Sequence, residues 1–232
     1  WKRIGGEQYA QEELRVTQEN ASQDSGKVPF LSLFKGKMKR VIWIGIILAA
    51  FQQWCGINVI FNYAQEIFTS AGYTNIIVTG SANLIFTVIA IFTVDKLGRR
   101  ALMRFGALSL TLIYLVMGCC YFFEIQGFLL LLLVVLAIAC YAVSLGAVVW
   151  VILAEIFPTR VRGTAVAIST FALWAACFIL TYTFPILNNS LGADGTFWLY
   201  GAICLAGYLF ITFRLPETKQ KSLEEIEKEL LK

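Results

Sequence analysis

The chain has 232 residues, of which 58% are hydrophobic and 14% aromatic, and its formal net charge is +4. Soluble domains are about 45–50% apolar, so this composition excludes an ordinary soluble protein and predicts an integral membrane protein. Histidine, the commonest metal ligand and proton shuttle, is absent, and the six cysteines lack the spacing of a metal site. We expect no metal, no cofactor and no nucleic-acid partner.

Residues 1–40 are polar, and they predict a cytoplasmic linker that contains one short amphipathic helix. The chain begins at Trp1 without a methionine, a charged leader or a cleavage site, so we expect a piece of a longer protein. Residues 41–213 are predicted to form a membrane-spanning bundle, and residues 214–232 a cytoplasmic tail helix. Six apolar segments within the bundle are each long enough to cross a bilayer, and they are 41–68, 76–94, 102–123, 127–157, 164–187 and 196–213.

All 19 basic residues fall on one side of these six segments. They lie in the linker, around the loops after the second and fourth segments, and in the tail. The other three loops, at 69–75, 124–126 and 188–195, contain no lysine or arginine. Because basic loops are retained in the cytoplasm, this pattern predicts both termini on the cytoplasmic side. The expected fold is an all-α membrane protein, a bundle of six transmembrane helices.

Four amide side chains interrupt the first apolar segment. Amides at that depth cost free energy unless they find hydrogen-bond partners. Their clustering favours a wet cavity that binds a neutral, hydroxyl-rich molecule, and hydrogen bonds between helices are the alternative. In a straight helix three of them fall within an arc of about 120°, whereas Gln53 lies about 100° outside it. Gly56 lies among them and predicts a bend. The four amides are Gln52, Gln53, Asn58 and Asn62.

No carboxylate, lysine or arginine lies in the middle of the apolar segments. An intramembrane hydrolase or a metal-dependent enzyme would need a buried nucleophile, base or ligand set. An ion channel would more commonly show a ring of charges or a filter of carbonyl groups. The chain is therefore not expected to be an enzyme, and the handling of a neutral solute remains.

Two short loops on the basic side each combine a carboxylate with a pair of arginines. Their sequences are DKLGRR at 95–100 and EIFPTRVRG at 155–163. Such turns can clamp helix ends through ion pairs and caps, so we expect a latch between helices, with plain topology anchors as the alternative. The residues expected in this latch are Asp95, Arg99, Arg100, Glu155 and Arg162.

Three further side chains are candidates for the lining of the cavity that the amides predict. They are Asn83 in the second segment, Trp150 in the fourth and Trp174 in the fifth. Trp174 lies too deep for anchoring at the membrane interface. Ordinary packing would explain it, and so would an apolar platform against a sugar ring.

Four motifs occur in order along the chain and are specific enough to compare with a known family. They are QQ-x-x-G-x-N-x-x-x-x-Y at 52–63, DKLGRR at 95–100, W-x-x-x-x-EIFPTR-x-RG at 150–163 and PETK at 216–219. Together they resemble the sugar porter family of the major facilitator superfamily, and within it bacterial sugar–proton symporters. The resemblance implies the C-terminal half of a twelve-helix transporter, built from 3+3 inverted repeats, that works by alternating access.

The resemblance also implies roles for single residues. Those matched to hydrogen bonds with sugar hydroxyls are Gln52, Gln53, Asn58 and Asn83. Those matched to packing against the sugar are Trp150 and Trp174, and those matched to the outer gate are Gly56, Asn62 and Tyr63. The cytoplasmic charge network that stabilises the outward-facing state is matched by Asp95, Arg99, Arg100, Glu155 and Arg162. The chain departs from the family pattern at Asn62, where relatives often have tyrosine, and at Leu173, where they often have an amide.

The predicted function is therefore transport of a monosaccharide, either a hexose or a pentose, by proton-coupled symport. A facilitative sugar uniporter and a membrane sugar sensor that does not transport are the alternatives. The expected partners are a monosaccharide, protons, the lipid bilayer and the N-terminal six-helix half that would complete the cavity. The expected location is the inner or plasma membrane.

Overall fold

The computed structural model describes residues 6–8, 11–12, 14–15, 33–34, 36, 38–61, 75–125 and 127–219. Within these ranges the chain forms helices, turns and irregular stretches, and no strand. The main elements are α2 (Met38–Trp54), α4 (Asn75–Leu97), α5 (Arg99–Phe122), α6 (Phe128–Tyr141), the π-helix η2 (Ala142–Gly146), α7 (Ala147–Ile156) and α8 (Arg162–Arg214).

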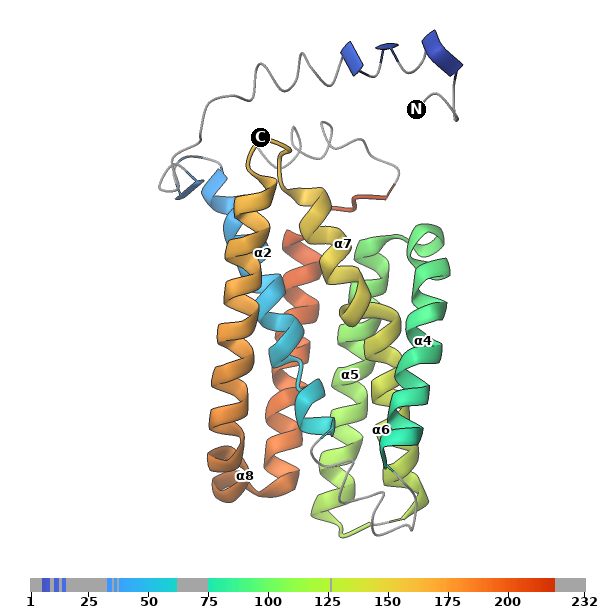
Figure 1. Ribbon diagram of the computed structural model, residues 1–232. Helices are drawn as coiled ribbons and strands as arrows, with labels where there is room; N and C mark the ends of the chain where they lie inside the picture. Colours follow the sequence, from blue (N-terminus) through green and yellow to red (C-terminus); the bar gives the residue numbers. More distant parts are fainter. Residues whose placement is uncertain are drawn as a thin grey trace.

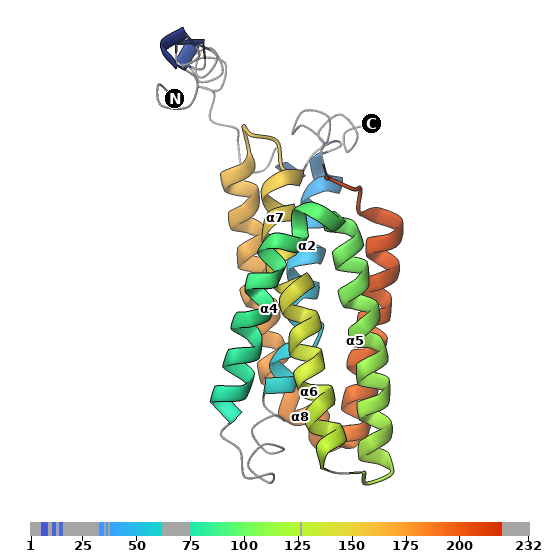
Figure 2. The same cartoon turned by 90° about the vertical axis from the view of Figure 1, so that its right-hand side faces the viewer.

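The helices pack side by side into one bundle, with their axes in the same general direction (Figure 1). At one end of the bundle α2 begins, α4 leads into α5, and α7 leads into α8 (Figure 1). The view turned by 90° shows the same arrangement (Figure 2). We call this the basic end, because the described basic side chains of the bundle belong to it: Lys39, Arg40, Lys96, Arg99, Arg100, Arg104, Arg160, Arg162, Arg214 and Lys219.

α8 is 53 residues long, which at 1.5 Å per residue is more than twice what one crossing of a bilayer needs. Its chain runs away from the basic end and back again (Figure 1). The reversal occurs at Gly192, where φ is 73° and ψ is 176°. We refer to residues 162–191 as the first arm and to residues 193–214 as the second arm. A loop is predicted at 188–195, but these residues are helical in the structure except at the turn at Gly192. Glycine is the residue that tolerates positive φ.

Four helical stretches are long and apolar enough to cross a membrane: Met38–Phe61, Arg99–Phe122, Phe128–Ile156 and Arg162–Arg214. α4 contributes a shorter apolar stretch, Gly80–Val94. With α8 counted as two arms, these stretches correspond to the six segments of the sequence pattern.

The stretch Phe128–Ile156 is interrupted at its centre by the π-helix η2. α5 lies close to η2 because Gly106 has no side chain, and a Cβ there would collide with Ser144. The Ser144 hydroxyl donates to the carbonyl of Cys140 within its own helix. The sequence predicts one continuous helix here, since the extra residue of a π-turn leaves an apolar stretch apolar.

The last described residues differ from the prediction. A tail helix is expected from residue 214 onward, but α8 ends at Arg214 and residues 215–219 are not helical. Pro216 explains this, because proline disfavours the helical conformation of the residue before it. The rest of the predicted tail helix lies outside the described residues.

Candidate functional site

The amide cluster lies where α2 is broken. α2 ends at Trp54, the backbone of Gly56 has φ of +84°, and residues 57–61 are helical again. A Cβ on Gly56 would lie 2.9–3.1 Å from three carbon atoms of Tyr200, on the second arm of α8. Both the positive φ and this close approach require glycine. The break thus exposes backbone and side chains to a neighbouring helix, as at the discontinuous helices of transporters.

Replacing Gly56 with alanine should destabilise the protein by about 1–2 kcal/mol, because a Cβ is strained at this φ and meets the Tyr200 ring. The matched control is Gly80→Ala in α4, where nothing lies within 4 Å of the added Cβ. The midpoint of thermal unfolding in detergent should fall for the first variant and stay unchanged or rise for the second. Equal midpoints for the two variants would contradict this account of the break.

Gln53 and Asn58 face each other across the break. The Asn58 amide nitrogen donates to Gln53 Oε1 at 2.9 Å and also lies 3.7 Å from Cys177 Sγ on the first arm. The straight-helix expectation that Gln53 points away from the other amides is wrong, because the chain changes direction at Gly56. Both side chains are half-buried. No recorded hydrogen bond of the described residues uses Gln53 Nε2 or Asn58 Oδ1, so the pair presents one donor and one acceptor.

Gln52 connects α2 with the π-helix. Its amide nitrogen donates to the carbonyl of Leu145 at 3.1 Å and to that of Gly146 at 3.0 Å, and the side chain is 2% exposed. A π-turn shifts the hydrogen-bond register of a helix, and such turns are frequent at functional sites. Gln52 Oε1 accepts no hydrogen bond from the described part of the chain. The nitrogen of Gln52 thus holds the π-helix while its oxygen remains an acceptor.

The other candidates lie on the outside of the described bundle. Asn83 is exposed on α4, Trp150 on α7 is 43% exposed, and Trp174 on the first arm is 65% exposed. Large aromatic side chains that stay exposed are suited to contact with a ligand or with another part of a protein. The remaining two gate candidates, Asn62 and Tyr63, lie outside the described residues.

Trp54 is a residue of this region that the sequence analysis does not single out. Its indole nitrogen donates to the carbonyl of Ala176 at 3.0 Å, which ties the end of α2 to the first arm of α8. Cys204 on the second arm similarly approaches the Cys55 carbonyl at 3.4 Å. The position of Trp54 between Gln53 and Cys55 was the available signal, because a tryptophan at a helix break needs a partner for its N–H.

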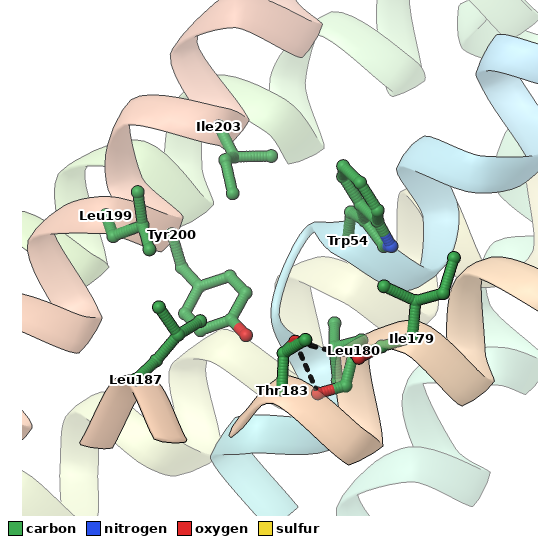
Figure 3. Close-up of a pocket in the computed structure, with 8 residues that line it drawn as sticks. All are labelled: Trp54, Ile179, Leu180, Thr183, Leu187, Leu199, Tyr200 and Ile203. Carbon is green, nitrogen blue, oxygen red and sulfur yellow. Dashed lines mark hydrogen bonds between the residues drawn. The ribbon is translucent and has the colours of Figure 1, made fainter. Parts of the chain in front are cut away.

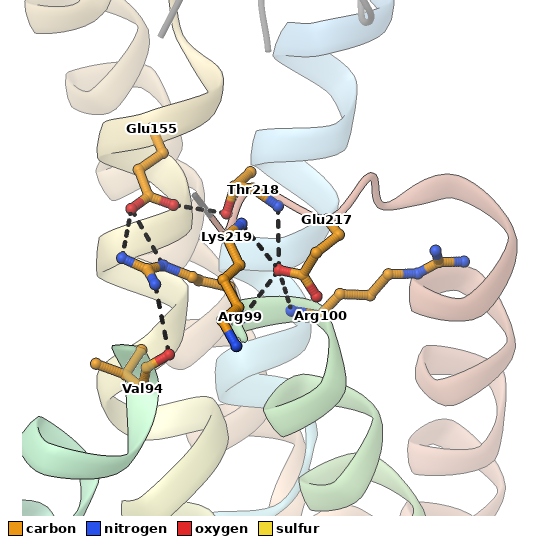
Figure 4. A network of polar contacts seen from close by, with 7 residues as sticks. All are labelled: Val94, Arg99, Arg100, Glu155, Glu217, Thr218 and Lys219. Atoms are coloured by element: carbon orange, nitrogen blue, oxygen red, sulfur yellow. Dashed lines mark hydrogen bonds and ion pairs between the residues drawn. The ribbon is translucent and has the colours of Figure 1, made fainter. Parts of the chain in front are cut away.

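The polar contacts that Figure 4 draws at the basic end centre on two carboxylates, those of Glu217 and Glu155. Glu217, just beyond α8, accepts hydrogen bonds on one oxygen from the backbone N–H groups of four residues. The donors are Arg99 at 3.1 Å, Arg100 at 3.5 Å, Thr218 at 3.1 Å and Lys219 at 3.1 Å. Because Arg99 and Arg100 open α5, the carboxylate caps that helix, which has no side-chain cap of its own at Gly98.

Glu155, one residue before the end of α7, forms the second centre. Its Oε1 lies 3.0 Å from Arg99 Nη2 and 3.2 Å from Arg99 Nε, and its Oε2 accepts from the Thr218 hydroxyl at 2.6 Å. The two ion-pair side chains are only 15% and 21% exposed. Arg99 therefore joins α5 to α7, and Glu155 joins α7 to the segment beyond α8.

The structure does not place every expected residue in this network. The guanidinium of Arg100 points away from Glu217 (Figure 4) and donates to the carbonyl of Thr212. Arg162 donates to the carbonyl of Phe157 at 3.2 Å and to the Thr159 hydroxyl at 3.3 Å, within its own loop. The side chain of Asp95 lies outside the described residues. Glu217 was missed, although the PETK motif placed a carboxylate directly beyond the last helix.

Comparisons with known proteins identify the relatives of this chain. A family model described as "Sugar (and other) transporter" matches residues 2–230. The arabinose-proton symporter of Bacillus subtilis is 36% identical over 97% of this chain and 50% of its own length. The D-xylose-proton symporter of Escherichia coli is 39% identical over 81% of this chain and 40% of its own length. The glucose facilitated diffusion protein of Zymomonas mobilis is 37% identical over 81% of this chain and 42% of its own length.

The fold matches a solved structure of the same superfamily. The proton:xylose symporter XylE, a major facilitator superfamily protein bound to 6-bromo-6-deoxy-D-glucose, superposes with a TM-score of 0.83 at 34% identity. That match covers 99% of this chain and 50% of the XylE chain. The chain spans about half the length of the relatives it matches and has the fold of one half of such a transporter. It belongs to the sugar (and other) transporter family.

Proposed function

We propose that this chain is the C-terminal six-helix half of a membrane transporter that carries a monosaccharide, a hexose or a pentose, by alternating access. The observation that carries the proposal is the amide pair of Gln53 and Asn58 across the break at Gly56. Sugar hydroxyls both donate and accept, so they can replace the bond between these two amides at little net cost. The names of the relatives, which specify arabinose, xylose and glucose, support a sugar of this size.

The site would combine groups from several helices. Gln53 Nε2, Asn58 Oδ1 and Gln52 Oε1 offer one donor and two acceptors to a sugar ring. Asn83 would add a polar contact, while Trp150 and Trp174 would pack against the C–H faces of the sugar. All three are exposed in this half, which is the arrangement needed if the other half closes the cavity over them. Gly56, Asn62 and Tyr63 would form the outer gate.

The basic end would form the inner closure. The described basic side chains of the bundle lie at this end, and the sequence pattern assigns all 19 basic residues to one side of the spans. This pattern supports a cytoplasmic basic end and a location in the inner or plasma membrane. Arg99, Glu155 and Glu217 would hold three helix ends together in the outward-facing state. Asp95, Arg100 and Arg162 would contribute charge to the same surface. Opening toward the cytoplasm then requires this network to separate.

Proton-coupled symport is the proposed mode of transport. Two of the relatives carry protons according to their names, and one is a facilitated diffusion protein, so uniport is the second candidate. A coupling carboxylate would have to belong to the N-terminal half, because no aspartate or glutamate lies in the middle of the spans of this chain.

The test is sugar flux into liposomes that contain the full-length protein. We expect uptake of D-xylose, L-arabinose or D-glucose that rises when the outside is made acidic. Asn58→Leu should weaken sugar affinity at least tenfold, which corresponds to about 1.4 kcal/mol of lost hydrogen bonding. The matched control is Thr93→Val on α4, whose hydroxyl donates to the Ile89 carbonyl of its own helix, and it should stay within about twofold of the parent.

Each other result has a definite meaning. Uptake that ignores the proton gradient would identify a uniporter. Sugar binding without flux would identify a sensor. Flux that is equally strong in the parent and in Asn58→Leu would remove the amide pair from the sugar site.

A further inference from the structure

An apolar groove runs along the outside of the bundle where α2 crosses the second arm of α8. Its part nearer the basic end has a volume of ≈ 340 Å³ and is lined by side chains that include Ile47, Ala50, Ala206 and Phe210. Gly207 and Phe51 also line it and pack closely together, since a Cβ on that glycine would collide with the Phe51 ring. The groove lies within two of the membrane-spanning stretches, Met38–Phe61 and Arg162–Arg214.

A second hollow continues the groove away from the basic end. Its volume is ≈ 260 Å³, and it shares Trp54 and Ile203 with the first. Figure 3 shows Trp54 across the space from Tyr200 and Leu187, so that both arms of α8 contribute to its walls. Ile203 extends from the same arm as Tyr200 (Figure 3). The two hollows form one apolar track along the second arm.

Both helices that flank the track carry an arginine where it approaches the basic end. In α2, Arg40 lies three residues before Trp43 and seven before Ile47, so the three share one helix face. In α8, Arg214 lies four residues after Phe210 and shares its face. Both arginines are exposed, and none of the ion pairs recorded among the described residues uses either of them. Trp43 is 46% exposed between Arg40 and the groove, the kind of residue found at the membrane–water interface.

We propose that this groove binds an anionic phospholipid, with its phosphate at Arg40 and Arg214 and one acyl chain along the apolar track. The charge of the headgroup complements the two arginines, and the groove offers an acyl chain an apolar lining. From Arg214 to Leu199 the second arm rises about 22 Å, whereas half the hydrocarbon core of a bilayer is about 15 Å. The track is therefore long enough for one acyl chain that lies parallel to the helix.

The proposal is tested with the full-length protein in lipid nanodiscs and a phosphatidylglycerol that carries a photoreactive diazirine in one acyl chain. Cross-links mapped by mass spectrometry should fall within residues 43–54 and 199–210. Unlabelled phosphatidylglycerol should compete for this labelling, and phosphatidylcholine should not. Arg40→Ala and Arg214→Ala should each weaken the competition about fivefold, the factor that corresponds to about 1 kcal/mol per arginine.

Two matched controls separate the groove from general charge and size. Lys96→Ala removes an exposed cation of the same end on α4 and should leave the labelling unchanged. Ala206→Trp should fill the groove and abolish labelling, whereas Ala202→Trp changes an exposed alanine of the same arm that does not line it.

Several results would overturn the proposal. Equal competition by unlabelled phosphatidylglycerol and phosphatidylcholine would indicate an ordinary annular lipid. Absence of labelling from both helices in the parent would show that another part of the protein covers the groove. Labelling that survives loss of both arginines would exclude them from the headgroup site, and this outcome does not depend on whether Ala206→Trp folds.

Discussion

Replacing Gln52 with leucine is expected to lower the free energy of unfolding by about 2–3 kcal/mol and to raise the sugar Kd at least tenfold. Leucine has a similar volume but removes both hydrogen bonds to the carbonyls of Leu145 and Gly146. Buried acceptors that lose their partners cost about 1–3 kcal/mol each, and Gln52 is 2% exposed. The loss of affinity would come from Gln52 Oε1, the acceptor that we assign to a sugar hydroxyl.

The measurements are thermal unfolding in detergent, without sugar and over a series of sugar concentrations. The matched control is Gln53→Leu, which loses one hydrogen bond at a half-buried position and should cost only about 1 kcal/mol. Both variants should lose sugar affinity, but only Gln52→Leu should strongly destabilise the sugar-free protein. A sugar-free midpoint of Gln52→Leu no lower than that of Gln53→Leu would show that the link between α2 and the π-helix is unimportant.

The arrangement of the spans could be predicted from the sequence because hydropathy and charge act along the whole chain. The six apolar segments and the single basic side reappear in the structure as six helical stretches with one basic end. Gly56 also signalled its own break, since a glycine among amides in a membrane span lets the helix unwind where polar groups must face a cavity.

Details that depend on a single extra residue could not be predicted. The π-helix adds one residue to a helix without changing its apolar character, so residues 142–146 gave no signal. The direction of the Gln53 side chain was mispredicted for the related reason that helical angles apply only to a straight helix. Its bond to Asn58 exists because the chain turns at Gly56, and that turn changes every angle beyond it.

The pairing within the charged network depends on contacts between distant parts of the chain. The sequence placed Glu155 and Arg162 seven residues apart in one loop, and both were expected in a latch between helices. The structure instead pairs Glu155 with Arg99, 56 residues away, while Arg162 turns back to its own loop. Spacing along the chain could identify the charged residues of the basic end, but only the packing of α5 against α7 decides the partner.

Replacing Arg99 with alanine should therefore loosen the basic end far more than replacing Arg162. Arg99 donates twice to Glu155, and both side chains are mostly buried, so removal of one partner leaves a poorly solvated charge. The free energy lost should be about 2 kcal/mol, which lies between the values for an exposed ion pair and for a fully buried one. Local opening should become about 30-fold more frequent, which is the factor that corresponds to this free energy.

Hydrogen exchange followed by mass spectrometry measures this opening directly. The backbone N–H groups of Arg99 and Thr218 bond to Glu217, so peptides that cover 94–104 and 213–219 should exchange faster in Arg99→Ala. Arg99→Lys keeps the charge but loses the double contact, and it should give an intermediate rate. Arg162→Ala is the matched control, because its bonds stay within the loop of Phe157 and Thr159. Equal exchange in Arg99→Ala and Arg162→Ala would mean that Glu217, through its backbone hydrogen bonds, holds this end without help from the ion pair.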